Sequence, residues 1–122
     1  MSEAFLIGGG QVYKLQGQRG ETPPCAEAKF KRGDIVKVSR RQGCEHIPAE
    51  LVILVAIPRH FSPDFALADI LAKPRPLMHQ VGSRSISYIL CREGDATPYH
   101  LKERDLRPSG KEPIEVGTVS EQ

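Results

Sequence analysis

The residues with the clearest chemical potential are a cysteine and a histidine one residue apart, Cys44 and His46. A thiolate and an imidazole are both zinc ligands, and a tetrahedral site needs two more ligands. Further candidates occur at Cys25, Cys91, His60, His79 and His100. The chain has no C-x-x-C knuckle, the paired short spacing that is typical of zinc modules. We therefore predict no metal site, and we interpret Cys91 as a small buried apolar residue at a strand end.

Nucleophilic catalysis needs a nucleophile, a base and a group that orients the base. Cys44 and His46 supply the first two only if the turn between them folds the side chains together. The chain has no Gly-x-Ser-x-Gly motif. Its triple glycine at residues 8–10 is followed by neither a Lys-Ser/Thr pair nor an expected helix, so a phosphate loop is not indicated. We predict no catalytic residue and no cofactor.

Four arginines, Arg40, Arg41, Arg59 and Arg84, lie at expected strand ends or in loops. If these ends cluster, the arginines form one basic rim around the mouth of a barrel. A guanidinium group suits a carboxylate or phosphate partner. The alternative is dispersed, solubilising charge, and basic residues at a strand edge also discourage edge-to-edge pairing.

Composition favours one small β-rich domain. The chain has 122 residues, 39% of them hydrophobic, with ten prolines, eleven glycines and no tryptophan. Frequent turn residues indicate short elements rather than a helical bundle. The net charge of +2 is too small to imply a polyanionic partner. Three cysteines are an odd number, so we expect no disulfide framework.

The sequence shows no targeting or membrane signal. No stretch approaches the roughly 20 apolar residues that span a bilayer. The first residues lack a basic region followed by an apolar signal-peptide core. We therefore expect a cytoplasmic protein with no membrane partner.

The expected strands alternate with turn signals. The barrel should begin at Phe30, and Val36 and Val38 share one face of its opening strand. Residues 49–58 form the strongest apolar run, and their β-branched content predicts a strand covered on both faces, either by the N-terminal arm or by a partner. A later strand, residues 86–91, is followed by a return strand at residues 98–101.

A helical insertion is expected between the central strands. Ser62 is a good N-cap, Pro63 suits the first helical position, and Asp64 complements the helix dipole. Lys73 and Pro74 should end the helix after about two turns. With its flanking loop, the insertion covers residues 58–85, and insertions of this length often carry function.

The predicted fold class is mainly β, a small SH3-like barrel with a short helical insertion between central strands. Residues 1–28 form an N-terminal arm and linker, in which residues 4–15 suggest a hairpin around a glycine turn. Residues 29–108 form the barrel. Residues 109–122 are polar and predicted to be a disordered tail.

In outline the chain resembles the heat-shock protein Q family, also described as hemimethylated-DNA-binding. The matching positions, in order, are Phe30, Gly33, Val36, Phe61–Ala72, Tyr88 and Tyr99–Leu101. The resemblance covers about residues 29–108. It implies a non-enzymatic adaptor or regulator of other proteins. The outline is also similar to the C-terminal barrel of the nitrile hydratase β subunit and to nitrogen-fixation accessory proteins, which implies a subunit or maturation factor of a larger enzyme.

A third resemblance points to an enzyme. Residues 32–36 followed by residues 48–52 are similar to the start of MazF/PemK-type endoribonuclease toxins, which carry Arg-Pro-Ala-Leu-Val. Ile47 occupies the position of the arginine that acts on RNA, and Glu50 interrupts the run. Because the cation at the phosphate is missing, we rank a nuclease below a binding function.

Our leading hypothesis is a protein-interaction module that acts as an adaptor, accessory subunit or assembly factor of a larger protein or enzyme complex. Nucleic-acid binding is the alternative, because barrels of this type also bind phosphate backbones with basic edges. The sequence does not determine the oligomeric state. For Phe65 and Leu71, a core-facing role competes with a binding role. The predicted binding residues are Arg40, Arg41, Arg59, Phe61, Phe65, Leu67, Leu71 and Arg84.

Overall fold

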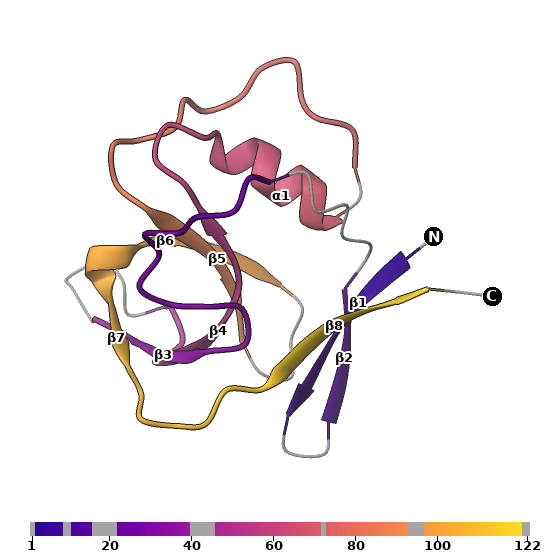
Figure 1. Ribbon diagram of the computed structural model, residues 1–122, viewed down its shortest axis with the longest axis vertical. Coiled ribbons are helices and arrows are strands. Elements are labelled where there is room, and N and C mark those ends of the chain that lie inside the picture. Colours follow the sequence, from indigo (N-terminus) through magenta and orange to yellow (C-terminus); the bar gives the residue numbers. More distant parts are fainter. Residues whose placement is uncertain are drawn as a thin grey trace.

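Five antiparallel strands form the main sheet of the computed structural model (Figure 1). They are β3 (Ile35–Val38), β4 (Glu50–Ile57), β5 (Ser87–Cys91), β6 (Pro98–Lys102) and β7 (Leu106–Pro108). Their order is β6-β5-β4-β3-β7, so β7, the last of these strands along the chain, pairs with β3, the first of them. The structure describes residues 2–8, 11–15, 22–39, 46–71, 73–92 and 97–120. The predicted mainly-β, barrel-like class with a helix between central strands is confirmed.

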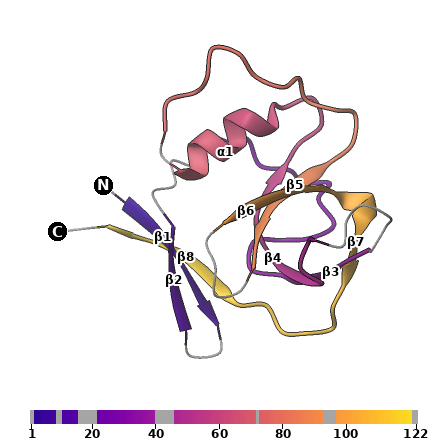
Figure 2. The same ribbon diagram turned by 180° about the vertical axis from the view of Figure 1, so that it is seen from behind.

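One helix, α1 (Pro63–Leu71), connects β4 to β5, and a short 3-10 helix, η1 (Glu103–Asp105), connects β6 to β7. The helix begins at the predicted proline and ends close to the predicted stop. The loop over residues 73–86 arches over α1 before it enters β5 (Figures 1 and 2). The expected helical insertion is therefore present.

The sheet separates two apolar clusters. On the concave side, the large buried side chains include Phe30, Val36 and Tyr88, together with Leu51 and Ile53 of β4. This arrangement confirms that residues of alternating strand positions share a face, as the sequence pattern predicts. Phe30 and Tyr88 meet edge to face, with ring centroids 5.7 Å apart.

The second cluster lies between the sheet and α1. It joins Val52 and Leu54 of β4 to Ala66 and Ile70 of α1, with Cys91 fully buried beside them. The predicted burial of β4 on both faces is thus confirmed. The predicted cause needs correction, because the chain's own helix covers the outer face, where the sequence suggested the N-terminal arm or a partner.

A second sheet combines the two ends of the chain. Its strands are β1 (Ser2–Gly8), β2 (Gln11–Leu15) and β8 (Glu115–Ser120), in the order β2-β1-β8. β1 and β2 form the expected hairpin, with Ala4 opposite Leu15. In both ribbon views this sheet lies beside the five-stranded sheet (Figures 1 and 2).

The C-terminal segment differs from the predicted disordered tail. The Ser109 hydroxyl donates to the carbonyl of Ile35 at 2.6 Å, and the Ile114 N–H donates to the carbonyl of Gly33 at 2.9 Å. Gly33 has φ = 92°, and a Cβ there would meet the Ile114 carbonyl at 2.1 Å. The polar composition does not predict this order, because the segment is held by hydrogen bonds to backbone carbonyls of residues distant in sequence.

Candidate functional site

The insertion is closed by backbone contacts between its two ends. The His60 N–H donates to the carbonyl of Ser83 at 2.8 Å. A Cβ on Gly82 would meet the carbonyl carbon of His60 at 2.3 Å and the carbonyl oxygen of Phe61 at 2.5 Å, so only glycine allows this approach. His60 itself has φ = 68°, a left-handed conformation that is uncommon for residues other than glycine. The root of the insertion is therefore a close-packed junction.

Gln80 fastens the long loop to the start of α1. The Ser62 hydroxyl donates to the Gln80 carbonyl at 2.7 Å. The Gln80 N–H donates to the Asp64 carboxylate. Both backbone polar groups of Gln80 are thus satisfied by the first turn of the helix, which fixes the loop over α1.

Arg75 organises a cluster of rings at the outer side of α1. Its Cζ lies 4.9 Å from the centroid of the Phe65 ring and 5.7 Å from that of the Phe61 ring. The His79 ring packs against the Phe65 ring, with the two ring centroids 4.3 Å apart. A guanidinium over an aromatic face is attracted by the ring quadrupole. The arginine also pairs with the buried carboxylate of Asp69 at 3.3 Å.

The predicted apolar binding residues of the insertion are half-buried. Phe61 and Leu67 pack against the cluster between the sheet and α1. Phe65 lies in the ring cluster with Phe61 and Arg75, at 6.2 Å between the two phenylalanine centroids. Leu71 is the last residue of α1 and is half-buried as well. Phe61, Leu67 and Phe65 thus have a packing role in addition to their partial exposure.

The most exposed apolar side chains are three that the sequence did not single out. Leu77 is 100% exposed, Met78 is 91% exposed and Val81 is 81% exposed. All three belong to the loop that Gln80 and Arg75 hold in place. Their sequence signal is weak, because a proline-flanked loop has no periodicity that marks a side chain as outward-facing.

Two of the predicted arginines, Arg59 and Arg84, line one groove of about 470 Å³. The cations that line it are Lys29, Arg59, Arg84, Arg104 and Arg107, and we call this feature the basic groove. Arg59 pairs with Glu27 at 3.4 Å, and both side chains are largely exposed. The predicted clustering of strand-end arginines is therefore found for these two residues. Arg40 and Arg41 lie outside the described residues.

The carboxylate that lines the basic groove, Glu103, is engaged by the barrel. It accepts hydrogen bonds from the Tyr88 hydroxyl at 2.5 Å and from the Lys29 N–H at 3.1 Å. Burial, followed by this hydrogen bond, raises the pKa of Tyr88. The Tyr88 oxygen in turn accepts from the Phe30 N–H at 3.2 Å. Glu103 thus closes the barrel, while the surrounding cations face the groove.

Three of these cations were not among the predicted binding residues. Lys29 precedes β3, Arg104 lies in η1 and Arg107 lies in β7. The fold brings them to Arg59 and Arg84, which stand at the two ends of the insertion. No local sequence pattern predicts that these cations lie together, because their proximity depends on the pairing of β7 with β3.

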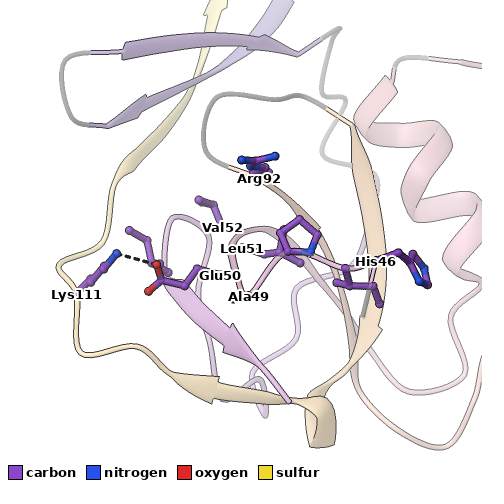
Figure 3. A pocket seen from close by; sticks show the side chains of 10 residues that line it. His46, Ala49, Glu50, Leu51, Val52, Arg92 and Lys111 are labelled. Atoms are coloured by element: carbon purple, nitrogen blue, oxygen red, sulfur yellow. Dashed lines mark hydrogen bonds and ion pairs between the residues drawn. The ribbon is translucent and has the colours of Figure 1, made fainter. Parts of the chain in front are cut away.

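An open hollow of about 460 Å³, which shares no lining residue with the basic groove, lies near the start of β4 (Figure 3). Its polar side chains are His46, Glu50, Arg92 and Lys111, placed around apolar side chains that include Leu51. The Lys111 ammonium pairs with the Glu50 carboxylate at 2.8 Å, which Figure 3 marks with a dashed line. His46 is exposed at the rim, and Cys44 lies outside the described residues. Among the described residues that line this hollow, Glu50 is the carboxylate, and it is held by Lys111.

A hydroxyl and an imidazole do meet in the sheet. His100 Nε2 lies 2.9 Å from Ser87 Oγ, and burial lowers the pKa of His100. A serine nucleophile must reach a substrate carbonyl. Ser87 is only 5% exposed, at the first position of β5, between Ile57 of β4 and Lys102 of β6. The imidazole therefore satisfies the buried hydroxyl of Ser87.

Among the described residues, no group of three His, Cys, Asp or Glu side chains is placed to hold a metal ion. Within the same ranges, no helix is long and apolar enough to span a bilayer. Ile47, the position that carries arginine in the nuclease pattern, packs half-buried against the barrel core. No family model, curated protein or solved structure matches this chain.

Proposed function

We propose that this chain is a non-enzymatic protein-interaction module whose contact surface is the outer side of the insertion. The single observation behind the proposal is the loop that displays Leu77, Met78 and Val81 almost fully to solvent. Single exposed apolar residues are ordinary on protein surfaces. Three large ones within five residues, on a loop fastened to its own helix, are typical of an interaction site.

The energetics support this role. Transfer of one such side chain from water into an interface contributes about 1.5–3 kcal/mol. The loop is held by Gln80 and by the contact of Gly82 with His60, so a partner meets a surface that is already ordered. Preorganisation reduces the entropy cost of binding. We place the protein in the cytoplasm as an adaptor, accessory subunit or assembly factor of a larger complex.

Affinity capture from the native cell tests the proposal. The wild-type chain should retain partner proteins at high salt, and the double variant Leu77→Ser/Met78→Ser should lose them. A matched control replaces two exposed polar residues, Lys73→Ser/Glu112→Ser, and should retain the partners. Both variants should unfold at the wild-type temperature. Capture of the same proteins by the Leu77/Met78 variant, or of none by the wild type, would count against the proposal.

Nucleic-acid binding is a second candidate, and the basic groove is the observation that favours it. Cationic side chains that contact phosphates release counterions, so binding of this kind weakens steeply as salt rises. Single-stranded and duplex oligonucleotides, titrated at two salt concentrations, separate this candidate from an apolar protein interface.

A further inference from the structure

The basic groove continues into two other hollows along the side of the insertion. Ser85 lines the basic groove and also a second hollow, which Val81 and Lys102 line as well. Pro63, Gln80 and His100 are shared by the second hollow and a third one. Because consecutive hollows share lining residues, they are neighbours, and we call this row of three hollows the path.

The chemistry changes from one end of this path to the other. The first hollow is dominated by the five cations of the basic groove. The third, of about 170 Å³, is mostly apolar and is lined by Leu67, Ile89 and Tyr99 together with two prolines; its polar lining residues are Asp64, Gln80 and His100. A hollow of this size holds one apolar side chain. The path therefore matches a ligand that is anionic at one end and apolar at the other.

Three of the five cations of the groove are available for a ligand, whereas Arg59 pairs with Glu27. Across the described ranges, no carboxylate lies within ion-pair distance of Arg84, Arg104 or Arg107. A guanidinium group binds a carboxylate through two parallel hydrogen bonds, which gives direction as well as affinity. Several arginines in one groove thus favour a run of acidic side chains.

We infer that the partner contributes an extended peptide segment, with acidic residues in the basic groove and an apolar side chain in the hollow beside Leu67. This inference rests on the proposed function and specifies the partner's chemistry. A nucleic acid fits less well, since the described residues that line the basic groove include no aromatic side chain on which a base could stack. A phosphodiester backbone also has no group for the apolar hollow.

Labelled synthetic peptides test the inference with the intact chain. The probes carry a run of glutamates followed, after Gly/Ser spacers of increasing length, by a single leucine. Fluorescence anisotropy should show binding at one spacer length. Replacing the glutamates by glutamine, or the leucine by serine, should each weaken binding by about tenfold or more. These changes lie in the peptide, so they cannot disturb the fold.

The matching protein variants reverse two charges each. Arg84→Glu/Arg107→Glu should abolish peptide binding, whereas Lys73→Glu/Arg92→Glu, with the same change in net charge at exposed positions that line none of the three hollows, should preserve most of it. Failure of every peptide to bind, or equal binding to both variants, overturns the inference. Preferential binding of an oligonucleotide, lost in the Arg84/Arg107 variant, overturns it in favour of nucleic acid.

The two proposals fail separately. If cellular partners are captured through Leu77 and Met78 while no peptide binds, the interaction module stands and the acidic-segment inference is wrong. If peptides bind the basic groove while Leu77→Ser/Met78→Ser leaves capture unchanged, the groove stands and the exposed loop is not the contact surface.

Discussion

The Arg75 guanidinium lies 3.3 Å from the carboxylate of Asp69, whose side chain is only 2% exposed. The same carboxylate accepts a hydrogen bond from the Thr22 hydroxyl at 2.9 Å. Thr22 precedes the barrel, Asp69 lies in α1 and Arg75 follows the helix. One buried charge thus connects three segments of the chain at the base of the exposed loop.

Replacing Arg75 by alanine should lower the free energy of unfolding by about 1–3 kcal/mol, because the buried Asp69 carboxylate loses a charged partner. The half-exposed position of the arginine keeps the loss below that of a fully buried pair. Urea denaturation measures it. Arg92→Ala, at an exposed position, is the control and should change stability by less than about 0.5 kcal/mol. Equal stability of the two variants would show that the pair does not hold the insertion.

Replacing Ile70 by alanine should lower the free energy of unfolding by about 2–5 kcal/mol, since its side chain is buried between α1 and β4. Leu77→Ala removes the same kind of apolar volume from a fully exposed side chain. It should change stability by less than about 0.5 kcal/mol. Thermal or urea unfolding compares them. A small effect of Ile70→Ala would contradict the docking of α1 on the sheet.

Replacing Gly82 by alanine should lower the free energy of unfolding by about 1–3 kcal/mol, because the new Cβ meets the His60 and Phe61 backbone. Gly110 provides a contrast, with φ = 78° but no atom within 4 Å of a Cβ. Gly110→Ala should cost only about 1 kcal/mol of backbone strain. Calorimetry of both variants gives the ranking. The reverse ranking would argue against the close junction at the root of the insertion.

Stability should fall at alkaline pH through Tyr88. Burial raises the pKa of its hydroxyl above the ordinary value of 10, so the native state retains a proton that the unfolded state releases. The stabilisation is complete below pH 10 and declines as the pH rises above it. Denaturation at increasing pH measures the slope. Tyr88→Phe should be less stable at neutral pH, by about 1–3 kcal/mol for the unsatisfied groups it leaves, and should show a shallower alkaline decline. An unchanged decline would assign the effect to other groups.

The binding residues show where sequence reasoning succeeds and where it stops. The insertion and its helix were predictable, because Ser62, Pro63 and Asp64 are local start signals and Pro74 is a local stop. The outward position of Leu77 and Met78 was not predictable, since a loop without periodicity does not indicate which of its side chains are buried in the core. Arg59 and Arg84 were singled out as strand-end cations, whereas the approach of Arg104 and Arg107 depends on the return of β7 to β3.

The sequence alone determined several elements of the barrel: the alternation of apolar residues in the strands, the doubly buried run that became β4, and the helix between central strands. These follow from interactions between residues close along the chain. The tertiary structure alone decided that α1 covers the outer face of β4, that the polar C-terminal segment pairs with β1, and that five cations share one groove. Each of these depends on contacts between distant residues, whose free energies are realised only when the whole chain is folded.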